Sequence, residues 1–432
     1  MARNCLISLK WLSLGLFLLI AGWNSELIVR AEGPPVWIIC TGGCPFSQIQ
    51  QVIDIAKPGD LLLVGPGTYR ENLTINKSLT LQGVTRELTR IEGATPGKPV
   101  IHIESEEEIA VSLENFTFAN ATRAEGSLLA VGCADWPLCP DGIQVLGEVK
   151  VAIKNTQIAS NAHNGLIAQG EAQVVLSNSE ISSNRWNGLE VLGLPQVTLY
   201  NSTVFENGID GVHVENYVVG SAQVSLNNSH ISKNRDDGLD IRGSGRVQLS
   251  NSSVFENRVH GLRLLDSAEV SLSNSLVSSN GGFGLRVAHS VQVNLSNSEV
   301  SNNSYDGLSV VGEAQVSVSS SEISSNGFVG VTVGGTGFAT VKIQDSTISG
   351  NSLAGILLWG RGISEIRRNS IMNNGYYGVA LYLTECIANY DIEKNFNGQV
   401  TGSDNTIPDK DEPDGNKLDD VCPSWLSFLK QP

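Results

Sequence analysis

Apolar and polar residues alternate in short runs, and these runs recur about every 23 residues through most of the chain. Counted from the first asparagine of a unit, such as Asn178, apolar residues stand at positions −4, −2, +3, +11 and +13. Alternation with a period of two predicts three short β-strands in each unit. Strands this short bury a core only when each unit stacks on the next, so the pattern predicts a parallel β-solenoid.

Two polar positions repeat with the same period, an asparagine at +6 and a glycine at +10. Identical amides stacked one strand separation apart, about 4.8 Å, can bond to one another and to backbone groups of the turns. We therefore interpret the asparagines as a structural ladder, and the glycines as sites of positive φ or close backbone approach before the third strand. The ladder residues are Asn161, Asn184, Asn207, Asn234, Asn257, Asn280, Asn303, Asn326, Asn351 and Asn374.

The two ends of the chain differ from the repeats. Residues 1–31 combine Arg3 and Lys10 with a short apolar stretch, which indicates a cleaved signal peptide and a secreted or periplasmic protein without a membrane span in its mature chain. Residues 32–120 are expected to hold an N-terminal cap, with a short helix over the open end of the core, and the first coils. The remaining divisions are an inserted loop at 121–141, regular repeats at 142–383 and a closing segment at 384–432.

Six cysteines remain after residue 31, and an even number in an exported chain favours disulfides. Their number alone leaves many pairings open. We expect neighbouring cysteines to pair, because each such pair brackets a region outside the regular repeats. The spacings C-x3-C and C-x5-C have no histidine nearby, which argues against zinc. The expected pairs are Cys40 with Cys44, Cys133 with Cys139, and Cys386 with Cys422.

Composition narrows the classes of partner. The chain has 432 residues, of which 17% are charged, and a formal net charge of −16. Binding to nucleic acid needs concentrated lysine and arginine, so this charge argues against it. The low charged fraction follows from Ser, Asn and Thr at the outward positions of the repeat. We also expect the protein to be a monomer.

The segment from Phe46 to Gly83, with its AKPGD and GPGTYREN motifs, resembles the opening of right-handed parallel β-helix proteins of the pectate-lyase superfold. The repeats of the form N-S-x-I-x-x-N-x-x-x-G-L are similar to their generic coils. The resemblance implies an all-β fold, a single right-handed β-helix with an N-terminal capping helix and a disulfide-pinned C-terminal segment. The group contains lyases, hydrolases, epimerases, tailspikes and a copper-related periplasmic protein, so the resemblance does not select an activity.

Charged residues interrupt the neutral outward columns at +9 and +12. Because adjacent coils lie about 4.8 Å apart, five coils would place these charges on one patch roughly 20 Å long, which suits several sugar units. Aromatic residues border the patch: Trp186 and Tyr305 within the repeats, and Trp136 in the inserted loop. The charged members are Glu190, Asp210, His213, Asp237, Asp240, His260, Arg263 and Arg286.

Three hypotheses follow for this patch. The favoured one is a noncatalytic module that recognises an extracellular or cell-wall polysaccharide through Trp136, Trp186, Glu190, His213, Asp240, Arg286 and Tyr305. The second is a polysaccharide lyase or glycoside hydrolase, with Asp210, Asp237, His260 and Arg263 as candidate catalytic residues. The third, a metal-delivery accessory protein, is favoured least because the histidines fall in different columns or in nonadjacent coils.

The RDDGLDIRG segment resembles the Asp-Asp motif of polygalacturonases, but VHG and RLL stand where that family has G-H-G and R-x-K. No cofactor motif is evident. If a metal binds, calcium held by Asp237 and Asp240 is the expectation. In the closing segment, a solvated acidic loop is favoured over a calcium site for Asp409, Asp411, Asp414 and Asp419, because Pro413 breaks the EF-hand register.

Overall fold

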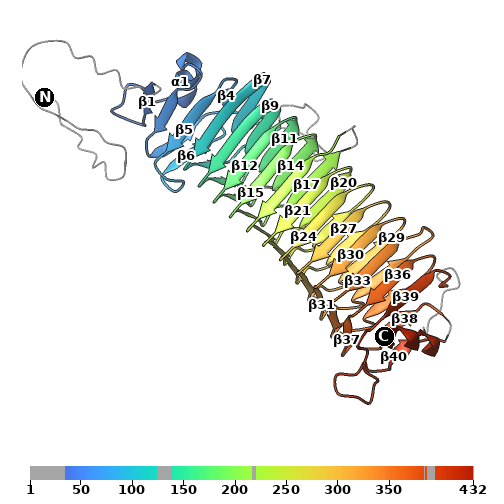
Figure 1. The fold of residues 1–432 in the computed structure, drawn as a ribbon. Helices are drawn as coiled ribbons and strands as arrows, with labels where there is room; N and C mark the ends of the chain where they lie inside the picture. Colours follow the sequence, from blue (N-terminus) through green and yellow to red (C-terminus); the bar gives the residue numbers. More distant parts are fainter. Residues whose placement is uncertain (1–34, 124–138, 217–219, 384, 387–394, 432) are drawn as a thin grey trace, which may run out of the picture. The chain divides into compact units, whose positions relative to one another are not determined.

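A computed structural model describes residues 35–123, 139–216, 220–383, 385–386 and 395–431. The predicted signal peptide lies outside the described residues, as do Cys133 and Trp136. In the described part of the chain, the strands pair in parallel, each with its counterpart one coil away. The strands follow one another along the stack in the order of the sequence, from the N-terminal to the C-terminal coils (Figure 1).

Each regular coil has the three strands that the alternation predicts. The register is exact from coil to coil, with Val174 opposite Val197, Ile181 opposite Val204 and others likewise. The first strands of the coils are β1 (Val36–Ile39), β2 (Leu61–Val64), β5 (Leu79–Gly83), β12 (Gln173–Ser177), β15 (Gln196–Tyr200), β18 (Gln223–Asn227), β21 (Arg246–Ser250), β24 (Glu269–Ser273), β27 (Gln292–Ser296), β30 (Gln315–Ser319), β33 (Thr340–Gln344), β36 (Ile363–Arg367) and β39 (Gln399–Ser403).

The second strands form a sheet of their own with 13 strands. It separates from the other sheet because the chain turns sharply on both sides of these short segments. They are β3 (Gly67–Arg70), β6 (Thr89–Glu92), β8 (Thr117–Ala119), β10 (Gln157–Ala159), β13 (Glu180–Ser182), β16 (Thr203–Phe205), β19 (His230–Ser232), β22 (Ser253–Phe255), β25 (Leu276–Ser278), β28 (Glu299–Ser301), β31 (Glu322–Ser324), β34 (Thr347–Ser349) and β37 (Ser370–Met372).

The third strands join the first strands in one sheet of 27 strands, because two long strands run through both positions. These are β7 (Ile101–Glu114) and β9 (Ile143–Lys154). The other third strands are β4 (Leu73–Ile75), β11 (Leu166–Gly170), β14 (Leu189–Gly193), β17 (Val212–Asn216), β20 (Leu239–Gly243), β23 (Leu262–Leu264), β26 (Leu285–Val287), β29 (Leu308–Val311), β32 (Val331–Gly334), β35 (Ile356–Leu358), β38 (Tyr377–Leu381) and β40 (Asp419–Cys422).

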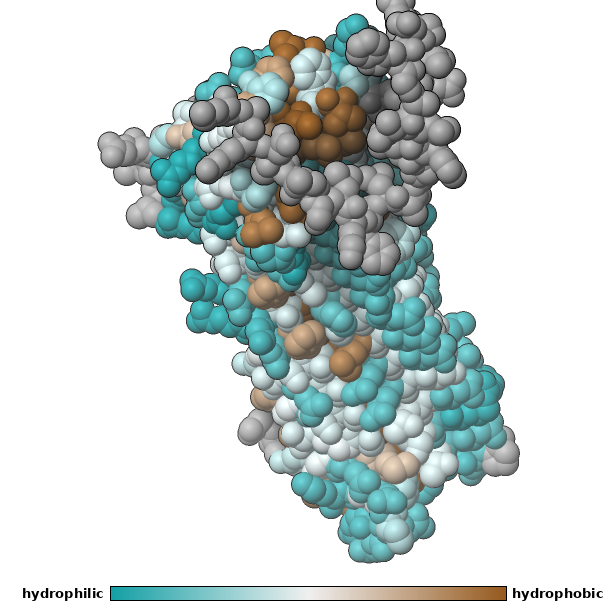
Figure 2. Space-filling model, turned by 90° about the vertical axis from the view of Figure 1, so that its left-hand side faces the viewer, coloured by the Kyte–Doolittle hydropathy of each residue, from teal (hydrophilic) through white to brown (hydrophobic). Residues whose placement is uncertain are grey.

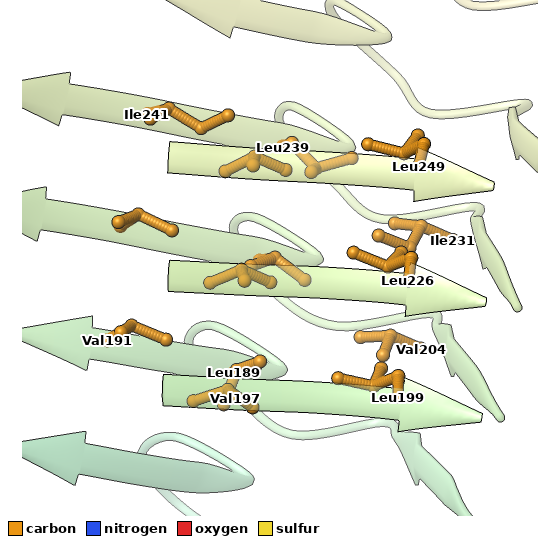
Figure 3. Packing of buried hydrophobic residues seen from close by; sticks show 14 of the residues in the cluster. Leu189, Val191, Val197, Leu199, Val204, Leu226, Ile231, Leu239, Ile241 and Leu249 are labelled. Atoms are coloured by element: carbon orange, nitrogen blue, oxygen red, sulfur yellow. The ribbon is translucent and has the colours of Figure 1, made fainter. Parts of the chain in front are cut away.

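The core lies inside the coils and continues through the stack as columns of like residues. Figure 3 shows Leu199, Leu226 and Leu249 above one another, with Val204 and Ile231 of the second strands beside them. These side chains are at most 1% exposed. The face drawn in Figure 2 carries mainly hydrophilic and intermediate side chains, with one group of hydrophobic side chains near the top of the view and a few separate ones below it. The alternation in the sequence therefore separates core from surface correctly.

The predicted asparagine ladder is confirmed. Asn257 is 1% exposed, its Nδ2 donates to Asn280 Oδ1 at 3.0 Å, and its Oδ1 accepts from the backbone N of Asn234 at 3.1 Å. A second ladder runs along the serines at +1, where Ser252 N donates to Ser275 Oγ at 3.2 Å, and sequence reasoning missed it. Together the two ladders satisfy turn backbone groups that would otherwise be buried without partners.

The glycines at +10 serve close approach and not positive φ. A Cβ on Gly261 would lie 2.6 Å from the carbonyl oxygen of Gly284 in the next coil, and its φ is not in the left-handed region. Left-handed residues stand instead at 0, at +5 and, in most units, at +15, such as Asn251 (φ 50°), Glu256 (φ 56°) and Asp266 (φ 63°). Of the two roles expected for these glycines, close approach is therefore the correct one.

Both ends are closed as the sequence suggests. Helix α1 (Ile49–Ile55) buries Ile49, Val52 and Ile53, and its first N–H groups donate to the Glu71 carboxylate. At the other end, Cys386 and Cys422 form a disulfide, and the 3-10 helix η2 (Ser424–Lys430) buries Leu426 and Leu429. The Cys40–Cys44 disulfide is also confirmed, and Cys139 is disulfide-bonded. Within the described residues, no helix is long and apolar enough to span a bilayer.

Candidate functional site

The charged +12 column is aligned as the repeat predicts. Neighbouring third strands pair Glu190 with His213, His213 with Asp240, Asp240 with Arg263, and Arg263 with Arg286. Each of these side chains therefore lies one strand separation from the next along the outer face of β14, β17, β20, β23 and β26. The register brings together residues that lie up to 96 positions apart in the sequence.

Exposure along this column differs sharply from residue to residue. Asp240 is 1% exposed and His213 is 8% exposed, whereas Arg286 is exposed. The short Asp240 side chain lies between His213 and Arg263 and is also contacted by Arg242, so longer side chains cover it. The expected open row of charges is thus partly covered, and the arginines form its accessible part.

The +9 column forms a third ladder that the sequence did not suggest. The backbone N of Asp237 donates to Asp210 Oδ1 at 3.0 Å, and the backbone N of His260 donates to Asp237 Oδ1 at 2.8 Å. The next coil continues with Phe283 N donating to His260 Nδ1 at 3.1 Å. Asp210, Asp237 and His260 are 5%, 2% and 8% exposed. These three candidate catalytic residues therefore hold backbone groups as well as carrying charge.

A compact cluster surrounds the His213 imidazole. Its Nδ1 lies 3.4 Å from Asp210 Oδ2 and 3.5 Å from Asp240 Oδ2, and its Nε2 lies 3.4 Å from Glu215 Oε2. Burial alone would lower the pKa of His213, but Asp210 and Asp240 outweigh it and raise that pKa to about 11. In the absence of another cation, the imidazole is therefore protonated and balances the two carboxylates.

Asp240 is held on one oxygen only. Arg242 donates to Asp240 Oδ2 from Nη2 at 2.6 Å and from Nε at 2.9 Å, while Arg263 Nη1 lies farther away at 3.8 Å. The contact of Asp240 with its column neighbour Arg263 is thus secondary to the contact with Arg242, a residue that the sequence analysis did not single out. Burial acts to raise the pKa of Asp240, but His213 and Arg242 prevail and lower it. Asp240 Oδ1 is buried without a hydrogen-bond partner.

Burial perturbs three further groups around the cluster. It raises the pKa of Asp237 to about 7, helped by nearby Asp210, and lowers that of His260 to about 4, helped by Arg286. It also raises the pKa of Glu190, whose Oε2 accepts from Asn187 Nδ2 at 2.5 Å. Strong perturbation of several groups in one place is typical of functional sites, although structural ion networks show it too.

An aromatic row continues from the cluster toward the C-terminal coils. Ring centroids lie 5.2 Å apart between His260 and Phe283, 5.4 Å between Phe283 and Tyr305, and 5.2 Å between Tyr305 and Phe328. Tyr305 is 48% exposed and Phe328 is 44% exposed. Of the predicted aromatic residues, Tyr305 belongs to this row. Its neighbour Phe328 was not predicted, because Phe328 becomes a candidate binding residue only when its alignment with Tyr305 is known.

The predicted Trp186 lies in a separate contact. Its ring packs against His163 with centroids 4.5 Å apart and an interplanar angle of 39°, and His163 Nδ1 is 2.7 Å from Asp141 Oδ1. The Asp141 carboxylate is fully buried and also accepts from Gln144 Nε2 at 2.8 Å. His163 and Asp141 were not predicted, because the inserted loop places Asp141 outside the regular repeat.

A shallow groove of about 800 Å³ lies elsewhere, at the turn between the first and second strands of six coils. Repeated Asn, Ser and acidic side chains line it, among them Asn274, Leu276 and Glu299. None of the predicted site residues lines this groove. The groove and the charged column are therefore separate surfaces.

Metal-ligating side chains converge in several places within the described residues. In the closing segment, Asp409, Asp419 and Asp420 lie together, but Lys430 Nζ is 3.0 Å from both Asp409 Oδ1 and Asp420 Oδ2. The Lys430 ammonium group therefore already balances these carboxylates with the positive charge that a metal ion would supply. Near the candidate site, Asp210 groups with His213 and Asp240, and also with Asp236 and Asp237. Among the described residues, none of these groups contains two histidines.

Comparisons with known proteins support the fold. The A-module of mannuronan C-5 epimerase AlgE6 from Azotobacter vinelandii is similar with a TM-score of 0.55 and 18% identity, covering 83% of this chain and 94% of that one. The catalytic unit of a GH87 α-1,3-glucanase from Streptomyces thermodiastaticus has a TM-score of 0.47 and 14% identity, covering 83% and 66%. At 18% identity, the likeness to the epimerase module shows the architecture only, and no argument rests on the glucanase.

A cell surface glycoprotein of Methanothermus fervidus is 32% identical over 89 residues, which cover 20% of this chain and 12% of that protein. A family model described as "Right handed beta helix region" matches residues 100–268, 217–371 and 260–409. These matches span most of the regular coils and confirm the handedness that the sequence resemblance implied. The chain is a member of the family of proteins with a right-handed β-helix region.

Proposed function

We propose that this protein binds an acidic extracellular polysaccharide, without cleaving it, along the outer face of its third strands. The observation that carries the proposal is the aromatic row of Phe283, Tyr305 and Phe328, whose rings repeat at 5.2–5.4 Å with two of them widely exposed. Exposed rings in a row suit the apolar faces of successive sugars, because such rings combine apolar contact with a fixed geometry.

The acidic character of the ligand follows from the charges beside the row. Arg286 is exposed, and the Arg263 side chain is 35% exposed. The neighbouring Asp237 and Asp240 are at most 2% exposed, so neither carboxylate contacts a ligand on this surface directly. Guanidinium groups bind carboxylates and sulfates with paired hydrogen bonds, so uronic acids or sulfated sugars fit this edge better than neutral sugars do.

An extracellular location supports the proposal. The chain forms disulfides, which persist in oxidising compartments, and its partial relative is a cell surface glycoprotein. The name of the epimerase with a similar fold refers to mannuronan, a polysaccharide. We therefore place this protein outside the cytoplasm, in contact with surface or matrix glycans.

Retention on an array of acidic and neutral polysaccharides tests the proposal. Tyr305→Ala and Arg286→Gln should each weaken retention on the acidic glycans that hold the wild-type chain. Tyr200→Ala is a matched control, because Tyr200 is 46% exposed on a first strand, away from the row. Wild-type retention on no glycan, or equal retention by Tyr305→Ala and Tyr200→Ala, would contradict the proposal.

Cleavage on the same face is the second candidate function. The observation that favours it is the pKa of Asp237, raised to about 7 mainly by burial, which suits a general acid at neutral pH. The 2% exposure of Asp237 and its bond to the His260 backbone count against it. Release of reducing ends or of unsaturated sugars, lost in Asp237→Asn, would replace pure binding with hydrolysis or elimination.

A further inference from the structure

The atoms around His213 are spaced more widely than direct hydrogen bonds are. The distances of 3.4 Å to Asp210 Oδ2 and 3.5 Å to Asp240 Oδ2 exceed the roughly 2.7–2.9 Å of charge-assisted hydrogen bonds. Ligands that share a tetrahedral zinc ion at about 2.0–2.2 Å lie about 3.3–3.6 Å from one another, because a tetrahedron's edge is 1.63 times its centre-to-corner length. Both observed distances fall in that interval.

We propose that Asp210, His213 and Asp240 bind one divalent cation of the zinc class, with His213 Nδ1 and one oxygen of each carboxylate as ligands. One ligand atom from each residue lies within 4.8 Å of the others. The three residues are 5%, 8% and 1% exposed, so few water molecules compete for the position.

Two buried atoms point to a missing partner. His213 Nδ1 and Asp240 Oδ1 are both buried without a hydrogen-bond partner. Leaving a buried polar atom unpaired costs about 1–3 kcal/mol, more when the group is charged, so such atoms usually mark an ion or a water. A cation held by His213 Nδ1 and the Asp240 carboxylate would bind the first atom directly and supply positive charge to the carboxylate that carries the second.

The remaining atoms of the three residues are held in the manner of a second coordination shell. Asp210 Oδ1 accepts from the backbone N of Asp237, and His213 Nε2 lies 3.4 Å from Glu215 Oε2. Arg242 donates to Asp240 Oδ2, the carboxylate oxygen nearer to His213, and so fixes that carboxylate directly. Contacts of this kind fix the orientation of metal ligands and tune their basicity. The cluster therefore holds its three ligand groups in place without the cation.

The donor set selects the class of cation. Calcium prefers six to eight oxygen ligands, whereas one imidazole and two carboxylates suit zinc and leave a fourth position open. Of the two residues expected to hold calcium, Asp237 and Asp240, only Asp240 belongs to this site. Asp237 lies in a separate acidic group with Asp210 and Asp236, without an imidazole.

Titration of the metal-stripped full chain with Zn²⁺ tests this site independently of any glycan. Isothermal titration calorimetry should give one site per chain, and thermal unfolding should move to higher temperature with Zn²⁺. His213→Gln and Asp240→Asn should each lower the affinity at least about tenfold. His230→Gln is the control, because His230 is exposed on the second-strand sheet and bonds to Ser253.

Circular dichroism of each stripped variant shows whether it folds. If His213→Gln does not fold, Asp210→Asn replaces it, because its amide oxygen can still accept from the backbone of Asp237. Loss of the site in the cluster variants with retention in His230→Gln supports the proposal. Absence of one-to-one Zn²⁺ binding, equal binding by wild type and the cluster variants, or binding of Ca²⁺ alone overturns it, leaving a proton on His213 as the balancing charge.

Discussion

Replacing Asn257 by alanine tests the ladder most directly. The Asn257 side chain accepts from Asn234 N at 3.1 Å and from Asn234 Nδ2 at 2.9 Å. It donates to Asn280 Oδ1 at 3.0 Å and to Ile231 O at 3.4 Å. The methyl group of alanine can neither donate nor accept, so the substitution removes all four hydrogen bonds. The backbone N of Asn257 keeps its bond to Asn280.

The expected loss of stability follows from the buried hydrogen-bonding groups that remain unpaired in Asn257→Ala. The backbone N–H of Asn234 is buried and has no alternative acceptor once the Asn257 oxygen is gone, which costs about 1–3 kcal/mol. The Asn234 amide keeps a longer bond to Val204 O at 3.4 Å, so it loses less. With a small cavity added, we expect Asn257→Ala to lower the free energy of unfolding by about 2–4 kcal/mol.

Urea denaturation followed by intrinsic fluorescence measures this loss, with Asn294→Ala as the matched control. Asn294 is exposed on the outer side of β27, so its removal should change stability by less than about 0.5 kcal/mol. Because a solenoid responds locally, hydrogen exchange should accelerate most in the coils on either side of residue 257. Equal urea midpoints for Asn257→Ala and Asn294→Ala would refute the ladder argument.

Three further predictions concern single features of the stack. Burial lowers the pKa of His260 to about 4 from its ordinary 6.5, so the unfolded chain takes up a proton first as pH falls. The His260 contribution to stability is complete above pH 6.5 and should be lost toward pH 4, by about 1–2 kcal/mol after solvent screening. Asp237, whose pKa is raised to about 7, changes stability in the opposite direction over this range, so the His260 contribution is measured as the difference in urea midpoints between wild type and His260→Asn across pH. Gly261→Ala should cost about 3 kcal/mol in the same assay, because its Cβ would lie 2.6 Å from a carbonyl oxygen of the next coil, whereas Gly42→Ala has nothing within 4 Å and should be neutral. Replacing Cys386 and Cys422 by serine opens a link of sequence separation 36 and should lower stability by about 3–4 kcal/mol, measured against the reduced and oxidised wild type.

The repeat made the fold predictable at the level of single side chains. The period of two within strands and of 23 between coils assigns Leu199, Leu226 and Leu249 to one inward column, and no tertiary information is needed for that step. The alignment of the serine ladder could be predicted in the same way, because Ser252 and Ser275 occupy the same position in their units. It was missed because a serine beside a turn is common and its hydroxyl role depends on the exact turn geometry.

The candidate site was harder to predict because its properties depend on neighbours that differ from coil to coil. The column placed Asp240 beside Arg263 correctly, yet only the rotamer of Arg242, two residues away on the same face, decides which guanidinium it binds. Burial of Asp240 follows from the length of its neighbours and not from its own position. His163 and Asp141 meet across an insertion, where the period no longer tells which residues are adjacent.

The ladders also bear on how such a chain can change its length. Residues 257–279 make up one period, and their removal would join Glu256 to Asn280, two residues that already occupy successive places in a unit. The backbone N of Asn234 would then find the Asn280 oxygen where it had found that of Asn257. Unequal recombination between units can therefore add or remove whole coils, because the new junction has the same order of residues as an ordinary unit. The outer face can lengthen or shorten by one coil at a time.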